Sequence, residues 1–166
     1  MKKNWPYLLL IAVLIGIDQV SKAWLSASLP HGSTRPVISG FFNLSHVHNR
    51  GAIFGFFNRS GGTLIYPLLT VLSLIALGLV VYYFIKVPAS QKLLKLTLSL
   101  VLAGALGNQI DRIFRGYVID FLDFYIGRHH FPSFNAADSC ITIGAGLLIF
   151  IFFFRKGSQC FLSSSG

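Results

Sequence analysis

Four long apolar stretches divide the chain, and shorter polar segments separate them. The stretches cover about residues 7–25, 64–85, 93–110 and 136–154. Each has about the 20 mainly apolar residues that a helix needs to cross the hydrocarbon core of a bilayer. The pattern therefore predicts an all-α integral membrane protein with four transmembrane helices, in a single membrane domain over residues 1–166.

The first apolar stretch could also be a signal peptide that is cleaved from the mature protein. Asp18 and Lys22 lie inside this stretch, however, and no clean small-residue cleavage site follows it. We therefore expect the first stretch to remain as a permanent helix.

The connection over residues 26–63 is too long for a simple turn between two helices. Its residues 35–47 combine β-favouring residues with turn breakers, which predicts a small extracytoplasmic β-like lobe inserted between the first two spans. An irregular loop is the alternative. The aromatic segment 51–57 suits the membrane interface, and we expect residues 49–57 to close over a site as a lid.

Charged residues are few and unevenly distributed. They make up 11% of the chain, with a formal net charge of +9, whereas soluble domains carry about a quarter charged residues. The basic residues are scattered among apolar runs and form no basic face, so we expect no nucleic-acid partner.

Six of the seven lysines fall on one side of the predicted spans, and the positive-inside rule assigns that side to the cytoplasm. Both termini are then cytoplasmic, and the connections 26–63 and 111–135 lie outside. The six lysines are Lys2, Lys3, Lys86, Lys92, Lys95 and Lys156.

The acidic residues are only five in number, and none of them is Glu. At 1.5 Å of rise per helical residue, all five come close to the outer boundary of the membrane. Ionisable groups at such places usually mark a functional site. The five are Asp18, Asp111, Asp120, Asp123 and Asp138.

Two local patterns suggest supporting roles. Asp18 and Lys22 are four residues apart, so they can pair on one helix face. Asn108, Asp111 and Arg112 project from one side of the third span. The alternative for each pattern is a purely structural polar contact between helices.

Other catalytic chemistries find little support. The chain has no Gly-x-Ser-x-Gly elbow and no Ser-x-x-Lys with supporting partners. We expect Cys140 and Cys160 to be buried or idle thiols. The histidine pairs 46/48 and 129/130 match no common zinc spacing. We therefore expect neither a metal nor another cofactor.

Paired carboxyl groups remain as the candidate chemistry. Two Asp side chains held together cannot both ionise, so one keeps a proton while the other acts as a base on water. Asp120 and Asp138 flank the loop between the third and fourth spans, where a close approach is easy. Asp123 is either a loop-stabilising acid or a substitute member of the pair.

Two functions from other classes compete with hydrolysis by a pair of carboxyl groups. A small proton-coupled or ion-conducting membrane protein could use the acids as a relay, but it predicts acids spread across the membrane depth. A structural scaffold leaves the gathering of the acids at one depth unexplained.

Four motifs in a fixed order carry a family resemblance. They are Asp18-Gln19-x-x-Lys22, Asn49-Arg50-Gly51-Ala52-x-Phe54, the run from Gly104 through Asn108, Asp111 and Arg112 to Asp120-Phe121, and Phe134-Asn135-x-Ala137-Asp138. In these motifs the chain resembles the lipoprotein signal peptidases (signal peptidase II), a family of bacterial inner-membrane aspartic peptidases. The resemblance covers residues 18 to about 146.

The resemblance implies that Asp120 and Asp138 are catalytic. It also implies a substrate, a prolipoprotein whose cysteine carries diacylglycerol and which is cleaved just before that cysteine. The site would lie near the outer, periplasmic face of the inner membrane, in contact with lipid, and we expect a monomer. The residues implied to bind substrate or support the site are Asp18, Lys22, Asn49, Gly51, Asn108, Arg112 and Asn135.

Overall fold

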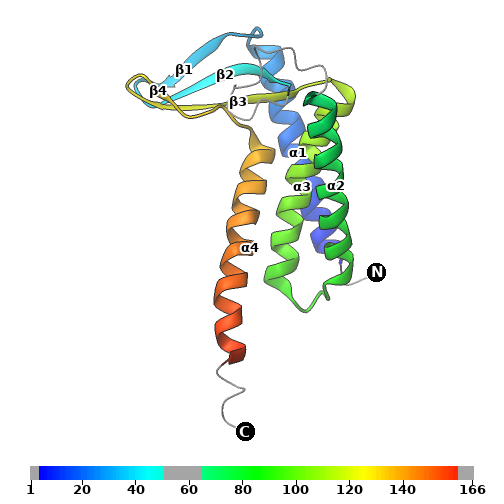
Figure 1. The fold of residues 1–166 in the computed structure, drawn as a ribbon. Coiled ribbons are helices and arrows are strands. Elements are labelled where there is room, and N and C mark those ends of the chain that lie inside the picture. Colours follow the sequence, from blue (N-terminus) through cyan, green and yellow to red (C-terminus); the bar gives the residue numbers. More distant parts are fainter. Residues whose placement is uncertain (1–3, 51–64, 161–166) are drawn as a thin grey trace.

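The computed structural model describes residues 4–50 and 65–160 of the chain. Four long helices cover the four apolar stretches, which confirms the prediction of four helices able to span a membrane (Figure 1). Helices α1, α3 and α4 extend several residues beyond at least one of their predicted limits, and α2 extends one residue beyond its predicted end. The helices are α1 (Trp5–Ser28), α2 (Ile65–Lys86), α3 (Lys92–Phe114) and α4 (Ala136–Cys160).

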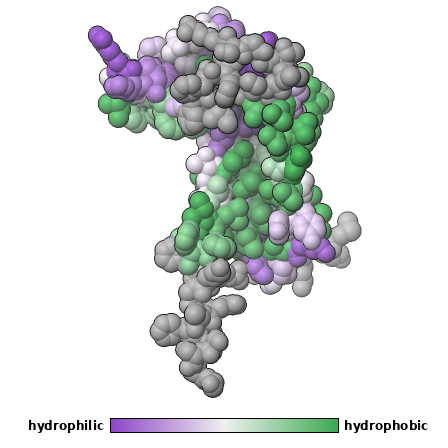
Figure 2. Space-filling model, in the orientation of Figure 1, coloured by the Kyte–Doolittle hydropathy of each residue, from purple (hydrophilic) through white to green (hydrophobic). Residues whose placement is uncertain are grey.

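The outer surfaces of the helices are strongly apolar. Mean hydropathy over their best windows is 1.8, 2.5, 1.4 and 2.0 for α1 to α4. In Figure 2, hydrophobic residues cover much of the visible helical part, while hydrophilic residues gather at its two ends. Exposed apolar side chains of this kind suit a lipid environment, in which they need no further protein partner.

Helix α3 is the centre of the bundle, because it packs against α1, α2 and α4. Its contact with α4 is close because glycines lie on both sides of it. A Cβ atom added to Gly104 would lie 2.2 Å from the Ala137 carbonyl oxygen, and one added to Gly144 would lie 2.5 Å from the Val101 side chain. Small residues of this kind allow membrane helices to approach closely.

A four-stranded antiparallel sheet in the order β1-β2-β3-β4 lies across one end of the helices (Figure 1). The predicted β-like lobe supplies only the first two strands, and the other two come from the connection between α3 and α4. The description of the chain as all-α with one small lobe therefore needs correction. The strands are β1 (Thr34–Ile38), β2 (Phe42–Asn49), β3 (Val118–Ile126) and β4 (His129–His130).

The chain enters β3 from α3 through a glycine turn. Helix α3 ends at Phe114, Arg115 is its C-cap residue, and Gly116 follows with φ +76°. This left-handed conformation costs glycine little, which is why glycine commonly follows the end of a helix. Strand β3 then pairs with β2 so that Asn49 lies opposite Val118 and Val47 opposite Asp120. The pairing brings Asn49 beside the first candidate catalytic residue.

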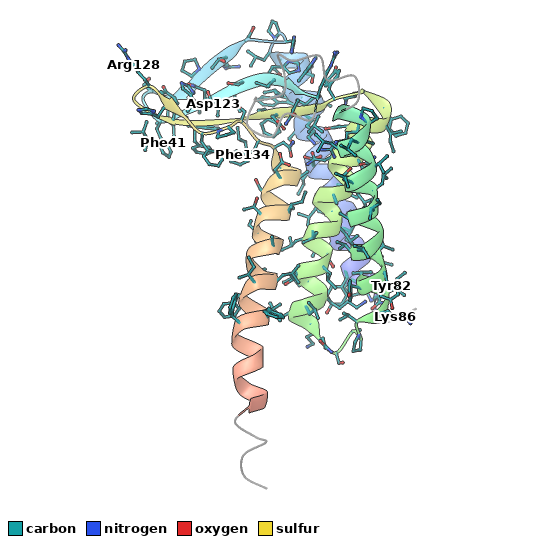
Figure 3. All side chains as sticks on the ribbon, in the orientation of Figure 1. Phe41, Tyr82, Lys86, Asp123, Arg128 and Phe134 are labelled. Carbon is teal, nitrogen blue, oxygen red and sulfur yellow. The ribbon has the colours of Figure 1, made fainter. Side chains whose placement is uncertain are left out.

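Aromatic rings gather on the sheet. Phe124 contacts Phe41 and Phe42, and it also stacks on Phe134 at a centroid distance of 5.9 Å. In Figure 3, Phe41 and Phe134 lie on the side of the sheet that faces the helical part, whereas Arg128 lies at the far tip of the sheet. The two labelled phenylalanines therefore lie on the same side of the sheet as the helices, a position that would suit the membrane interface, where aromatic side chains are favoured.

Two sequence predictions concern residues that the structure leaves undescribed. Gly51 and the aromatic segment 51–57 lie outside the described residues, so the proposed lid and its place in the interface stay predictions. Asn49, at the start of the predicted lid, is the last residue of β2.

Candidate active site

Asp120 and Asp138 lie on different elements, and one residue bridges them. Asp120 is on β3, and Asp138 is in the first turn of α4. The Asn135 side-chain Nδ2 donates to Asp120 Oδ1 at 2.7 Å, and the Asn135 backbone N–H donates to Asp138 Oδ2 at 3.2 Å. The structure therefore brings together the two acids that the sequence selected, with Asn135 between them.

Asn135 takes this position because it starts helix α4. Its side-chain Oδ1 accepts a hydrogen bond from the Asp138 backbone N–H at 2.9 Å, and the Asp138 carboxylate in turn accepts one from the Asn135 N–H. This reciprocal pair is a capping box, with Asn and Asp in the places more often taken by Ser or Thr and Glu. The spacing Asn-x-x-Asp thus both starts the helix and orients Asp138.

Asp120 is buried and close to a second carboxyl group. Burial and the negative charge of Asp138 raise the pKa of Asp120 from 3.8 to about 7, although hydrogen bonds from Asn49 and Asn135 and the charge of Lys22 act in the opposite direction. The bond from Asn49 Nδ2 to Asp120 Oδ2 is 2.9 Å long. Near neutral pH this carboxyl group can therefore hold a proton, as one member of an acidic pair must.

Asp138 is half-buried, and the groups that donate hydrogen bonds to it differ from those that hold Asp120. Asn108 Nδ2 donates to its Oδ1 at 2.7 Å, and the backbone N–H of Asn135 donates to its Oδ2. Its place in the first turn of α4 also puts it near the positive end of the helix dipole, which favours negative charge. The two acids thus have unlike environments.

Lys22 lies in a buried charge network directly behind the two acids. It is fully buried, and its Nζ contacts Asp18 Oδ2 at 2.8 Å, Asp111 Oδ2 at 2.7 Å and Asn108 Oδ1 at 3.1 Å. The ion pair between Asp18 and Lys22 that their spacing predicts is therefore present. Because Lys22 holds Asn108 from one side, the Asn108 amide is oriented toward Asp138 on the other.

Asp18 also ties α1 to the start of α4. Its Oδ1 accepts the backbone N–H of Ala137 at 2.9 Å, one of the helix N-terminal donors that lack a partner within the helix. Gly107 makes room for this contact, because a Cβ atom there would lie 2.7 Å from Asp18 Oδ2. Three helices therefore meet at the side of the site.

The sequence reasoning missed two members of this network. Arg115 forms an ion pair with Asp111, and its Nη1 also donates to Gln19 Oε1 at 3.0 Å. The Gln19 Nε2 in turn lies 3.2 Å from Asp111 Oδ1. The spacing of four residues from Asp111 to Arg115 was a usable signal. Arg112, the predicted supporting residue, lies half-buried on α3, and its role stays a prediction.

Asp123 lies apart from the pair, inside the sheet. Its carboxylate accepts hydrogen bonds from Asn43 at 3.0 Å and Ser45 at 3.3 Å, and it contacts His130 Nδ1 at 2.8 Å. Burial acts to raise the pKa of Asp123, but these hydrogen bonds and the charge of His130 outweigh it and lower the pKa. Asp123 thus links β2, β3 and β4, which fits the loop-stabilising alternative.

The histidines at 46 and 48 form a ring cluster. His48 stacks on His31 at 3.8 Å and on Tyr117 at 3.7 Å between ring centroids. His46 Nδ1 lies 2.7 Å from the Leu29 carbonyl oxygen. These contacts pack the end of α1 against the sheet.

The fold and the site define a class of protein. It is a membrane protein with four helices able to span the bilayer, and it has a pair of carboxyl groups at the end where a small sheet covers the helices. An acidic pair with unlike surroundings is an arrangement that suits hydrolysis by an activated water molecule.

Comparison with known proteins identifies the family. The model of the family described as signal peptidase (SPase) II matches residues 10–154, which is most of the chain. The chain belongs to the signal peptidase II family. The resemblance that the four motifs indicated is confirmed.

Relatives and solved structures agree with this assignment. The chain is 42% identical over 154 residues to a lipoprotein signal peptidase of Xanthomonas oryzae pv. oryzae, covering 92% of each chain. It is 43% identical over 145 residues to that of Syntrophus aciditrophicus, covering 86% of this chain and 89% of the relative. A solved bacterial membrane enzyme, determined by the in meso method at 2.3 Å resolution, is similar in fold, with a TM-score of 0.76 and 36% identity over 93% of this chain and 91% of that one.

Proposed function

We propose that the protein is an aspartic endopeptidase that cleaves diacylglyceryl-modified prolipoproteins just before the lipid-bearing cysteine. Removal of signal peptides from prolipoproteins is the activity of the family to which the chain belongs. The observation that carries the aspartic mechanism is the bridging of Asp120 and Asp138 by Asn135, with bonds of 2.7 and 3.2 Å. No metal or covalent intermediate takes part in the proposed reaction.

The unlike surroundings of the two acids suggest their roles. Ionised Asp138 takes a proton from a water molecule, whose oxygen attacks the carbonyl carbon of the scissile amide. Protonated Asp120 gives its proton to the carbonyl oxygen, so a neutral diol forms. When the diol collapses, one of its hydroxyl groups returns a proton to Asp120. The C–N bond then breaks as Asp138 protonates the leaving nitrogen, which restores both acids.

The surrounding residues would keep this arrangement in place. Asn49 and Asn135 hold the two oxygens of Asp120, and Asn108 holds one oxygen of Asp138. The network of Lys22 and Asp18 fixes Asn108 and the start of α4. Misplacing a reacting group by about 1 Å can cost about a hundredfold in rate, so these residues are positioning residues.

The location of the site suits a lipid-modified substrate. The protein belongs in the bacterial inner membrane, as a family member with four helices able to span it. We infer from the lysines that both termini are cytoplasmic and that the sheet and the acids lie at the periplasmic boundary. A cysteine with diacylglycerol would sit at that depth, with its acyl chains in the outer leaflet. Both acids come from one chain, so a monomer suffices.

Separate Asp120→Asn and Asp138→Asn variants test the pair. Each should lose cleavage of a purified, diacylglyceryl-modified precursor, while Asp123→Asn, the matched control in the same connection, should retain most of it. Unmodified precursor should be a poor substrate for the wild-type protein. Retained cleavage in either of the first two purified variants would contradict the mechanism, and an equal loss in Asp123→Asn would mean that the pair is wrongly assigned.

A further inference from the structure

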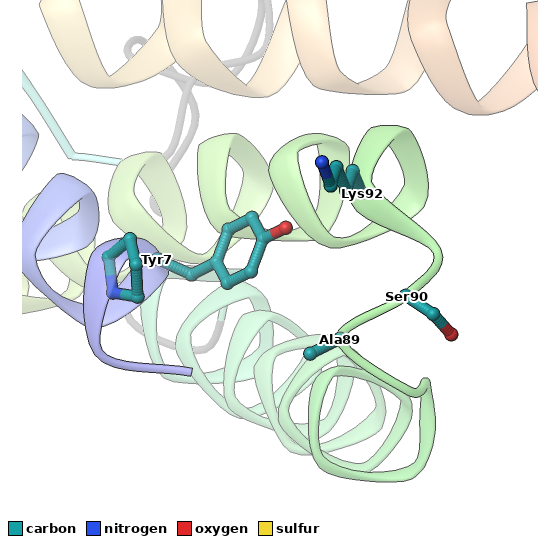
Figure 4. A pocket seen from close by; sticks show the side chains of 5 residues that line it. Tyr7, Ala89, Ser90 and Lys92 are labelled. Atoms are coloured by element: carbon teal, nitrogen blue, oxygen red, sulfur yellow. The ribbon is translucent and has the colours of Figure 1, made fainter. Parts of the chain in front are cut away.

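A cavity lies at the end of the bundle opposite the sheet. It has a volume of about 490 Å³ and is lined by Pro6, Tyr7, Ala89, Ser90 and Lys92. The volume is in the range of small-molecule sites, about 300–1,000 Å³. Figure 4 shows the Tyr7 ring lying between the start of α1 and the connection from α2 to α3, with Lys92 on the first turn of α3. Nothing in the proposed reaction uses this cavity.

The lining combines apolar walls with three polar groups. Pro6, Ala89 and the ring of Tyr7 supply apolar surface, and Lys92 supplies a positive charge. The Tyr7 hydroxyl can donate one hydrogen bond and the Lys92 ammonium three, whereas the Ser90 hydroxyl points away from both of them in Figure 4. Such a set suits a phosphate diester that is attached to an apolar body.

The charge around the cavity favours an anion. The acids nearest in sequence on the helices that form it are Asp18 on α1 and Asp111 on α3. Asp111 is 19 residues beyond Lys92, which corresponds to about 28 Å along the helix. No described acidic residue therefore offsets the charge of Lys92 at this end of the bundle.

The neighbouring lysines are engaged elsewhere. Lys95 is fully buried, where its Nζ donates to the Phe84 carbonyl oxygen and lies 4.1 Å from the centre of the Phe84 ring. Lys86 Nζ lies 5.7 Å from the Tyr82 ring, and Lys86 does not line the cavity. Among the described lysines, Lys92 is thus the one that lines the cavity.

The cavity continues onto apolar helix surface. Leu8 and Leu9, which directly follow Tyr7 on α1, are each 54% exposed, and Leu93 of α3 is 47% exposed. In a membrane these side chains would meet acyl chains rather than water. A soluble anion would use only the polar groups of the cavity, whereas a phospholipid would use both the polar groups and this adjoining surface.

We propose that this cavity binds the headgroup of an anionic phospholipid, with the phosphate at Lys92 and Tyr7 and the acyl chains along α1 and α3. Basic pockets between transmembrane helices are known binding places for anionic lipid headgroups. This proposal uses the proposed orientation of the protein, with both termini in the cytoplasm, in one respect only. That orientation means that the lipid comes from the cytoplasmic leaflet.

The two tryptophans of the chain allow a direct test, because Trp5 adjoins the cavity and Trp24 lies near the other end of α1. In a Trp24→Phe background, Trp5 fluorescence is measured in vesicles of phosphatidylcholine and phosphatidylglycerol. Bromine atoms on acyl chains quench tryptophan fluorescence. In one sample the phosphatidylcholine carries brominated chains and in the other the phosphatidylglycerol does, with the two lipids at equal mole fraction. We expect an apparent preference of about fivefold for phosphatidylglycerol, the factor that corresponds to one lysine near an anionic lipid.

Matched lysine variants separate a site from general attraction. Lys92→Gln should bring the preference close to one, while Lys86→Gln, the same charge change outside the cavity, should keep most of it. Equal quenching by both lipids in the wild-type cavity, or equal losses in the two variants, would overturn the proposal. Displacement by free glycerol phosphate at constant ionic strength would also overturn it in favour of a soluble anion.

The test is independent of the proposed peptidase activity. Both leaflets of the vesicles contain the anionic lipid, so the result does not depend on the orientation of the protein. The Lys92→Gln variant should still cleave modified precursor in detergent, because the cavity is at the far end of the bundle from Asp120 and Asp138. A failure of the lipid site and a failure of the proposed peptidase would therefore give different results.

Discussion

The contact between α3 and α4 gives a sharp test of how the site is held together. Gly104 lies one helical turn before Asn108 and packs on the backbone of Ala137, the neighbour of Asp138. A methyl group at Gly104 would lie 2.2 Å from the Ala137 carbonyl oxygen and 2.7 Å from the Ile141 side chain. Because the first of these neighbours is backbone, a rotamer change cannot relieve the clash, and the two helices must move apart.

The size of the movement predicts the loss of activity. Ordinary contact begins at 3.4 Å, so the helices must separate by about 1 Å at this point. Added to the 2.7 Å between Asn108 Nδ2 and Asp138 Oδ1, that displacement takes the pair beyond hydrogen-bond distance. We expect Gly104→Ala to lower kcat/KM about a hundredfold. Stability should fall by about 1–3 kcal/mol from overpacking, partly offset by the better helix propensity of Ala.

Gly146→Ala is the matched control, because Gly146 is on α4 and a Cβ atom there would meet nothing within 4 Å. It should leave cleavage unchanged and leave stability equal or slightly raised. The assay is cleavage of modified precursor by purified protein, together with thermal unfolding in the same detergent. If Gly104→Ala folds and cleaves as fast as wild type, the close helix contact does not position the acids and the reasoning is refuted.

Three further predictions concern the charged groups. Because the pKa of Asp120 is raised to about 7 and the mechanism needs its proton, kcat/KM should fall as the pH rises above about 7, by about tenfold per unit; a rate that stays constant from pH 6 to 9 would contradict this role. Lys22→Met leaves two buried carboxylates without their ammonium and should lower the free energy of unfolding, measured by calorimetry, by about 3–5 kcal/mol. The same change at the exposed Lys86 should lower it little. Asp123→Asn should destabilise the sheet by about 1–3 kcal/mol. Because the folded-state pKa of Asp123 is lowered from 3.8, its stabilisation is present above that pH and lost on acidification; hydrogen exchange in β3 as a function of pH would reveal the change, and an unchanged profile in the variant would count against it.

The catalytic candidates show which part of the site can be predicted from motifs and topology. Asp120 and Asp138 were selected as residues at the two ends of one outer connection, and the structure bridges them through Asn135. The sequence could not tell the role of Asp123 from that of Asp120 without the knowledge that both lie on one strand. On β3 the two acids are three residues apart, so they point to opposite faces, one toward Asn135 and the other toward Asn43 and Ser45.

In the charge network, too, the sequence predicts local contacts but not contacts between distant residues. The pair of Asp18 and Lys22 follows from spacing on one helix, because such a contact depends only on local geometry. The contact of Asp18 with the Ala137 backbone joins residues that are 119 positions apart. The choice of Arg115 as a partner of Asp111 depends on where Gln19 lies on another helix. Contacts of this kind are decided by packing.

The sequence by itself determined the four spans, the family and the gathering of acids at one end of the helices, and it predicts the direction of the spans. These features depend on span length, apolar character and charge, which act locally or through the membrane and need no knowledge of contacts between distant residues. Only the tertiary structure decided that β3 pairs with β2, with Asp120 opposite Val47, and that α4 starts against Asp18. Strand register and helix packing depend on partners far away in the chain. For that reason only the tertiary structure distinguishes the proposed catalytic acid, Asp120, from the structural acid Asp123.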